Sequence, residues 1–212
     1  MRKILILEGS NYCGKSTITQ LIKKTLTNAT IIELHDFYYL HILKQYPRIE
    51  NLTSKKAYSF LSDNYIKHAD KYLTHRNSLI LQYCMEMKNE DILIERSFLT
   101  QMVYRDLLFG RKDHLELHGL IKGFNEQKAQ LIFVTASPQT IARRIEYGDI
   151  EKKKIRKRNA TQYHLTDRET LIRKNELYNT YFDFLEFDYK YKLNTDLPLE
   201  NLEQNIHEII QA

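Results

Sequence analysis

The sequence predicts an α/β protein of three layers, in which a five-stranded parallel sheet is flanked by helices. Two observations support this fold. Short segments rich in Ile, Leu, Val and aromatic residues alternate along the chain with longer segments of helical periodicity. The first short segment runs directly into the pattern Gly-x-x-x-x-Gly-Lys-Ser, which is typical of a loop between a first strand and a first helix. Strands that alternate with helices form a parallel sheet, because each return to the same end of the sheet needs a crossover.

Each element follows from its local pattern. The predicted strands are residues 4–7, 30–34, 92–95, 131–135 and 189–193. The predicted helices are residues 16–26, 98–109, 114–127, 139–147, 167–186 and 199–210, together with 55–87, which is long enough for two helices or one bent helix. No linker separates independent apolar blocks, so we expect residues 1–212 to form a single domain.

The segment from Gly9 to Ser16 carries the strongest chemical signal. Gly9 and Gly14 permit backbone conformations that turn successive N–H groups inward, and this nest favours a polyphosphate at the start of the next helix. Lys15 would place its charge beside the β- and γ-phosphates, and the Ser16 hydroxyl would bind Mg²⁺. The loop residues that we expect around the phosphates are Gly9, Asn11, Tyr12, Cys13, Gly14, Lys15, Ser16 and Thr17.

A second signal follows the third predicted strand, where Glu95 and Arg96 stand side by side in the sequence. The carboxyl ends of parallel strands meet at one edge of the sheet, so this pair should face the loop. A carboxylate there would hold Mg²⁺ directly or through water, and the arginine would reach a transferring phosphoryl group. An ordinary Glu-Arg pair at a strand end is the alternative, but the preceding loop favours the catalytic interpretation.

Charge is concentrated in one part of the chain. Residues 143–158 hold eight Lys and Arg residues against three acidic ones, an excess equal to the formal net charge of +5. Such a segment indicates an anion site or a nucleic-acid patch, with a solvated charged loop as the alternative. The chain has two cysteines and no apolar run of membrane-spanning length. We therefore expect a soluble, cytoplasmic protein with no disulfide framework and no membrane partner.

Four segments together resemble the thymidylate kinase and deoxynucleoside kinase superfamily of P-loop kinases: residues 8–17, 94–97, 134–145 and 193–200. The resemblance covers nearly the whole chain. It implies a three-layer P-loop kinase fold, ATP as phosphoryl donor, Mg²⁺ as cofactor and a small-molecule nucleoside or nucleotide as acceptor. It also implies a LID, a segment that closes over ATP, at about residues 148–161.

The resemblance further implies roles for individual residues. Lys15, Glu95 and Arg96 would be catalytic, with Ser16 and Glu95 as ligands of Mg²⁺. The arginines that close over ATP would be Arg144, Arg156 and Arg158, of which the last two are also catalytic candidates. The loop after the last strand, with Asn194 and Thr195, would hold the adenine ring.

The two branches of the superfamily differ in the group that accepts the phosphoryl group. A nucleoside 5′-hydroxyl needs a carboxylate base, for which Asp36 is the catalytic candidate, although the proline that commonly follows this base is missing. A monophosphate needs no base but is engaged by an arginine about twenty residues before the acidic-Arg pair, a place that Arg76 occupies. The predicted acceptor-site residues are Asp36, Phe37, Tyr65, Arg76, Arg96 and Tyr104.

We favour the monophosphate acceptor, with a deoxynucleoside kinase as the alternative. The segment after the second strand lacks the Arg-Glu-Pro-type sequence of thymidylate kinases, so the two branches remain open at this point. A kinase that acts on groups within DNA and a non-enzymatic NTP-binding module are further alternatives. Nucleic acid is the less favoured partner, and a homodimer is left open.

Overall fold

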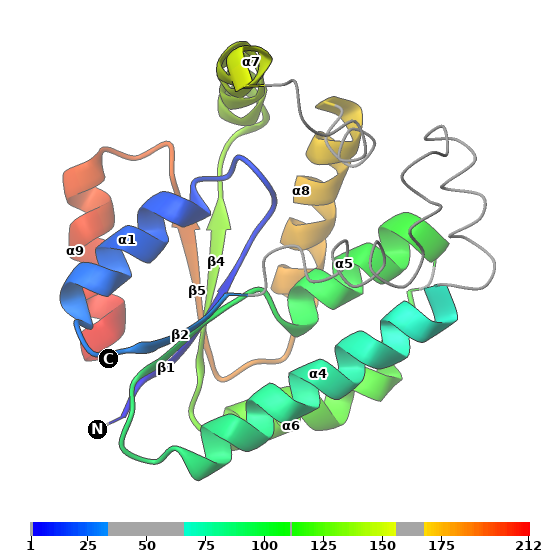
Figure 1. Cartoon of the computed structure of the whole chain (residues 1–212), viewed down its shortest axis with the longest axis vertical. Coiled ribbons are helices and arrows are strands. Elements are labelled where there is room, and N and C mark those ends of the chain that lie inside the picture. The colour runs from blue at the N-terminus through cyan, green and yellow to red at the C-terminus, as the bar shows by residue number, and fades with distance from the viewer. Residues whose placement is uncertain (1, 34–65, 111, 156–167) are drawn as a thin grey trace.

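Figure 1 shows a computed structural model of the chain, which describes residues 2–33, 66–110, 112–155 and 168–212. Five parallel strands form its sheet in the order β2-β3-β1-β4-β5. The strands are β1 (Ile4–Glu8), β2 (Thr30–Glu33), β3 (Ile92–Glu95), β4 (Gln130–Thr135) and β5 (Tyr189–Asn194). The predicted α/β fold with a five-stranded parallel sheet is confirmed.

The order of the strands places the ends of β1 and β3 side by side. β1 lies in the middle of the sheet between β3 and β4, with Leu7 in register with both Glu95 and Ile132. The chain moves from β1 to one side of the sheet for β2 and β3 and to the other side for β4 and β5. Ligands of open α/β sheets bind at the carboxyl edge where the strand order reverses in this way.

Helices cover both faces of the sheet. The helical elements are α1 (Lys15–Thr25), α4 (Ile66–Glu86), α5 (Phe98–Phe109), the short 3₁₀ turn η3 (Leu115–Leu117), α6 (His118–Glu126), α7 (Pro138–Ile155), α8 (Arg168–Phe184) and α9 (Leu199–Gln211). In Figure 1, α1 and α9 lie on one side of the sheet, and α4, α5, α6 and α8 lie on the other. None of these described helices has both the length and the apolar character of a membrane span.

The alternation of side chains along β1 produces a core on each face. Leu5 and Leu7 belong to the cluster with α1 and α9, whereas Ile4 and Ile6 belong to the cluster with α4, α5, α6 and α8. The cluster with α4, α5, α6 and α8 is rich in aromatic rings. The centroid of the Phe98 ring is 5.8 Å from that of Phe124 in α6.

The five strands agree with the sequence prediction to within one residue at each end. The predicted helix at 114–127 was wrong at its start, because a 3₁₀ turn precedes α6. Residues three apart share a side in a 3₁₀ turn, and here both His114 and Leu117 are buried while Leu115 is exposed. An α-helix at this point would not place the side chains of His114 and Leu117 so directly on the same side.

The predicted helix at 139–147 was too short, because α7 continues to Ile155. The basic stretch at its end still contains strong helix formers, and Asp149 precedes Lys153 by the four residues that favour a helix. The LID boundary expected at about 148 therefore falls within α7, and residues 156–167 lie outside the described residues. Of the predicted helix at 55–87, only the part that contains α4 is described.

We predict that Phe124→Ala lowers the free energy of unfolding by about 3–5 kcal/mol, because the Phe124 ring is fully buried against Phe98. Phe184→Ala is the matched control, since that ring is 81% exposed, and it should change the free energy by less than about 0.5 kcal/mol. Urea denaturation followed by circular dichroism measures both. Equal losses in the two variants would contradict the assignment of the core.

Candidate active site

The loop between β1 and α1 needs glycine at both ends. Gly9 has a φ of +146°, and a Cβ there would lie 2.4 Å from the carbonyl oxygen of Val134 on β4. Gly14 has a φ of +94° at the N-cap of α1, where a Cβ would lie 3.0 Å from a methyl carbon of Thr195. Both positions thus combine a left-handed backbone with close packing, which only glycine accommodates.

Lys15 folds back over the loop. Its side chain is 7% exposed, and Nζ donates hydrogen bonds of 2.8 Å to the carbonyl oxygens of Gly9 and Ser10. Burial, and next the charge of Arg96, lower the pKa of Lys15 from 10.5 to about 7. A polyphosphate in the loop would offer this amine an anionic partner.

Other predicted loop residues also lie around this turn. Cys13 is buried, and its thiol donates to the carbonyl oxygen of Ser10 at 2.9 Å. Tyr12 has a φ of +64°, which turns the backbone in the middle of the loop. Ser16 and Thr17 are exposed in the first turn of α1. The geometry leaves their side chains available to a ligand outside the loop.

Arg96 connects the end of β3 to the loop. Its Nη2 donates to Oδ1 of Asn11 at 2.9 Å, and its backbone N–H donates to the carbonyl oxygen of Leu7 at 2.9 Å. A φ of +67° is uncommon for a residue with a long side chain and marks a backbone that its surroundings hold in place. Arg96 and the loop are therefore brought together as the sequence predicts.

Glu8 is a site residue that the sequence analysis missed. Its fully buried carboxylate accepts hydrogen bonds from the N–H of Ser97 at 2.7 Å and from the hydroxyl of Thr100 at 2.5 Å. Burial raises the pKa of Glu8 above its usual value, while these hydrogen bonds oppose the rise. The carboxylate caps the start of α5 and thereby fixes the backbone beside Arg96. The available signal was a carboxylate directly after an apolar strand and directly before the loop.

Glu95 and Ser16 have the chemistry of a Mg²⁺ site. Glu95 is buried at the end of β3 and accepts a hydrogen bond from the hydroxyl of Thr19, one turn after Ser16 on α1. Mg²⁺ in phosphate-transfer sites is commonly held by one or two protein oxygens together with substrate phosphates. A carboxylate and a hydroxyl fit that requirement. Within the described residues, no group of three His, Cys, Asp or Glu side chains offers a metal site without a substrate.

Lys174 is a second residue that the sequence analysis missed. It lies on α8, is fully buried, and donates to the phenol oxygen of Tyr104 on α5 at 2.6 Å. Burial and the charge of Arg96 lower the pKa of Lys174, and Lys174 in turn lowers that of Lys15. The signal in the sequence was a lysine on the apolar stripe of α8, three residues after Leu171 and four before Tyr178.

Arg144 joins α7 to the loop and to the turn after β5. Its Nη1 donates to the carbonyl oxygen of Tyr12 at 3.1 Å and to the hydroxyl of Thr195 at 2.9 Å. The Thr195 hydroxyl donates in turn to the carbonyl oxygen of Cys13 at 2.7 Å, and Asn194 is exposed beside it. The structure thus places Arg144 and Thr195 against one side of the loop, with Asn194 next to Thr195 at the end of β5.

The residues predicted for the acceptor are only partly described. Tyr104 is half-buried and bonded to Lys174, which places it near the cations of the loop. Arg76 is half-buried on α4 and donates to Asn77, whose side chain bonds to Gln101 of α5. Five predicted residues lie outside the described residues: Asp36, Phe37, Tyr65, Arg156 and Arg158.

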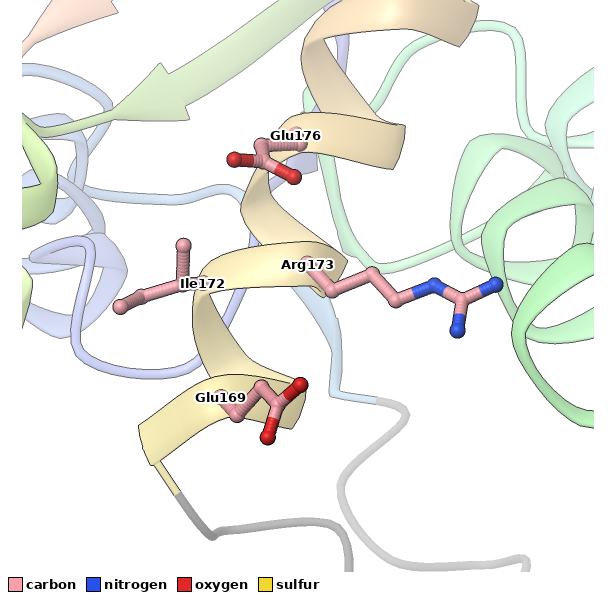
Figure 2. Close-up of a pocket in the computed structure, with 4 residues that line it drawn as sticks. All are labelled: Glu169, Ile172, Arg173 and Glu176. Atoms are coloured by element: carbon pink, nitrogen blue, oxygen red, sulfur yellow. The ribbon is translucent and has the colours of Figure 1, made fainter.

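An open pocket on α8 is lined by none of the predicted site residues. Figure 2 shows its lining residues along the helix, with Arg173 extending to the side opposite Ile172. The other two lining residues are Glu169 and Glu176. Two carboxylates against one guanidinium disfavour a phosphate, so we place the phosphate site at the loop.

Comparisons with known proteins show what the chain is similar to. No protein-family model matches the chain. The thymidylate kinase of Campylobacter lari is 28% identical to it over 209 residues, which are 97% of this chain and 98% of that protein. The relative thus spans the whole length that contains the loop, Arg96 and α8.

Solved structures of two kinases have the same fold. A structure of deoxyadenosine kinase from M. mycoides with dCMP and dCDP bound has a TM-score of 0.58 at 19% identity and covers 98% of each chain. Thymidylate kinase from Candida albicans has a TM-score of 0.62 at 12% identity, covering 99% of this chain and 91% of that one. The sheet order and the loop are those of a P-loop kinase fold, and over nearly its whole length the chain is similar to phosphotransferases of the thymidylate kinase and deoxynucleoside kinase superfamily.

Proposed function

We propose that the chain transfers the γ-phosphoryl group of ATP to a deoxynucleoside 5′-monophosphate, as a thymidylate kinase does. The observation that carries this proposal is the set of three basic side chains near the carboxyl edge of β1 and β3: the buried Lys15 and Lys174 and the half-buried Arg96. Positive charge that is removed from water is costly unless an anion balances it. A donor triphosphate together with an acceptor monophosphate supplies more negative charge at this place than a donor and a neutral nucleoside.

The donor side of the proposed site consists of the loop and its neighbours. Backbone N–H groups of the loop and the start of α1 would hold the phosphates, and Lys15 would exchange its two carbonyl partners for phosphate oxygens. Arg144, Asn194 and Thr195 would border the nucleoside part of ATP. Lys15 and Arg96 would then meet the charge that develops on the transferred phosphoryl group.

Ser16 and Glu95 would hold Mg²⁺ between them and the phosphates. The ion supplies charge neutralisation for the phosphate oxygens when it is bound. Thr19 orients Glu95 through its hydrogen bond, so the carboxylate has a fixed direction before any ligand enters. A fixed direction matters because transfer depends on positioning more than on covalent chemistry.

Tyr104 and Arg76 would engage the acceptor, together with Asp36, Phe37 and Tyr65 outside the described residues. Arg156 and Arg158 of the LID remain predictions for closure over ATP. A deoxynucleoside kinase is the second candidate, favoured by the structural likeness to deoxyadenosine kinase. That activity needs a base for the 5′-hydroxyl, and Asp36 is the candidate for it.

An acceptor screen separates the two candidates. We expect radiolabelled ATP with Mg²⁺ to label one or more of the four deoxynucleoside monophosphates and none of the four deoxynucleosides, because a monophosphate matches the charge of the site. A DNA oligonucleotide serves as a third class of acceptor. Labelling of deoxynucleosides alone, or of DNA alone, would contradict the proposal.

Lys15→Ala should reduce turnover by about 10³-fold or more, because the variant loses a charge that acts on the transferred phosphoryl group. Lys24→Ala is the matched control on the same helix. Lys24 is 73% exposed and 3.8 Å from Glu203, so its loss should leave turnover within about two-fold. Steady-state assays of both variants, with circular dichroism as a check on folding, test the role of the loop. Normal turnover in Lys15→Ala would contradict the proposed role of the loop in phosphoryl transfer.

ATP binding should take up a proton. Free Lys15 has a pKa of about 7, and a bound polyphosphate favours its charged form and raises that pKa. At about pH 8, where free Lys15 is mostly neutral, roughly 0.9 proton should be taken up per ATP bound, and the affinity should fall as pH rises above 7. Calorimetric titrations in two buffers of different ionisation enthalpy measure the uptake.

The control for this titration is Lys15→Arg, because a guanidinium stays charged throughout this pH range. It should bind ATP with little proton uptake and with an affinity that depends weakly on pH. Equal uptake in the wild type and in Lys15→Arg would show that another group takes up the proton.

A further inference from the structure

Arg96 has an uncommon backbone conformation, and two consecutive residues of β1 hold it. Its φ of +67° lies in the left-handed region, which a residue with a long side chain seldom occupies unless its surroundings keep it there. The N–H of Arg96 donates to the carbonyl oxygen of Leu7 at 2.9 Å. The next N–H, that of Ser97, donates to the carboxylate of Glu8 at 2.7 Å. The position of Arg96 therefore depends on the direction of the Glu8 side chain.

The Glu8 carboxylate is held in turn by a relay of two hydroxyl groups. Its Oε2 accepts from the hydroxyl of Thr100 at 2.5 Å, and the oxygen of that hydroxyl lies 2.7 Å from the phenol oxygen of Tyr178 on α8. A hydroxyl has one proton, and Thr100 uses its proton on the carboxylate, so the Tyr178 hydroxyl must donate to Thr100. The relay thus runs in one direction, from Tyr178 through Thr100 to Glu8, an order in which each hydrogen bond strengthens the next.

Burial makes this relay hard to replace with water. Glu8 and Tyr178 are fully buried, and Thr100 between them is half-buried. A buried carboxylate that loses a donor bears the cost of an unsatisfied acceptor, which favours a turn of its side chain toward another partner. Loss of either hydroxyl should therefore shift Glu8, and with it the backbone at the start of α5.

A second phenol of α8 makes the same kind of contact at another place. Tyr181 donates to the carboxylate of Asp106 at 2.7 Å. Asp106 lies in the last turn of α5, whereas Thr100 lies in its first turn, next to Arg96. Both phenols connect α8 to α5, but of these two contacts the one made by Tyr178 leads to the Glu8 carboxylate.

We propose that Thr100 and Tyr178 are positioning residues for Arg96. Through the Glu8 carboxylate they fix the start of α5, so that the guanidinium stands where it meets the charge on the transferred phosphoryl group. This inference rests on the proposed transfer from ATP and assigns two residues that set its rate. Because both act through Glu8, their contribution appears in turnover and not in the affinity for ATP.

The test measures steady-state kinetics of the full-length protein with ATP and the acceptor that the wild type phosphorylates in the acceptor screen. Thr100→Val removes a hydroxyl but keeps the size of the side chain. Tyr178→Phe keeps the ring, whose centroid is 6.0 Å from that of Phe133. Each variant should lower kcat by about 10- to 100-fold, the scale for a misplacement of about 1 Å, with the KM for ATP within about three-fold.

Two further variants separate positioning from a general effect on the fold. Thr100→Ser keeps the hydroxyl and should keep kcat within about three-fold of the wild type. Because Tyr178 acts through Thr100, Thr100→Val combined with Tyr178→Phe should lower kcat no further than either change alone. The assays are run well below the melting temperature of every variant. Tyr178→Phe is a mild change, so the test stands even where Thr100→Val fails to fold.

Tyr181→Phe is the matched control. It removes a phenol hydroxyl from the same helix and breaks a hydrogen bond of the same length, 2.7 Å, between α8 and α5. Since Asp106 lies at the other end of α5 from Arg96, kcat should stay within about two-fold even where the melting temperature falls. The loss of a contact between helices is thereby separated from the loss of positioning.

Three results would overturn the inference while leaving the proposed function intact: a normal kcat in Tyr178→Phe, additive losses in the double variant, or an equal loss in Tyr181→Phe. A wild-type protein that labels deoxynucleosides alone or DNA alone would instead contradict the monophosphate acceptor, and the same variants would then test the inference on that acceptor. A wild-type protein that transfers phosphate to no acceptor would overturn both.

Discussion

The buried carboxylate of Glu8 joins the elements that form the candidate site. It ends β1 directly before Gly9 and accepts hydrogen bonds from Ser97 and Thr100 at the start of α5. Arg96 immediately precedes that start, so the same carboxylate holds the loop and the arginine at a fixed separation. The hydroxyl of Thr100 also bonds to that of Tyr178 at 2.7 Å, which extends the connection to α8. Loss of Glu8 would therefore loosen the alignment of three elements.

The cations around this carboxylate are more numerous than stability alone would favour. After burial, the charge of Arg96 lowers the pKa of both Lys15 and Lys174, and the charge of Lys174 lowers that of Lys15. Such an arrangement costs folding free energy in the absence of a ligand. A polyphosphate would offset the repulsion and stabilise the folded protein in proportion to its affinity. The clustered positive charge thus explains why the site lowers the stability of the free protein and why it would bind a polyphosphate.

The sequence predicted the parts of the site that depend on local pattern. The glycines of the loop and the Glu95-Arg96 pair follow apolar strands, and the parallel sheet then brings the ends of those strands together. The placement of Lys15 and Arg96 at the loop could be predicted for this reason. The lengths of α5 and β3 were also predictable, because Ser97 and Gly110 interrupt the periodic segments at the observed ends.

Glu8 and Lys174 could not be assigned by the same reasoning. Periodicity treats a charged residue in an apolar strand or stripe as an interruption, and only tertiary contacts show that each is buried with a partner. The continuation of α7 beyond 147 was missed because the clustered charge suggested a loop, whereas helix propensity prevailed. Charge pattern and backbone preference gave opposite expectations there.

The central claim is that one set of cations serves a donor triphosphate and an acceptor monophosphate together. Thermal unfolding in the presence of two bisubstrate analogues tests it most directly: adenosine and deoxynucleoside joined by a pentaphosphate, which mimics ATP with a monophosphate, or by a tetraphosphate, which mimics ATP with a nucleoside. We expect the pentaphosphate to raise the melting temperature more than the tetraphosphate or ATP. A larger rise with the tetraphosphate would contradict the claim and assign the site to a nucleoside acceptor.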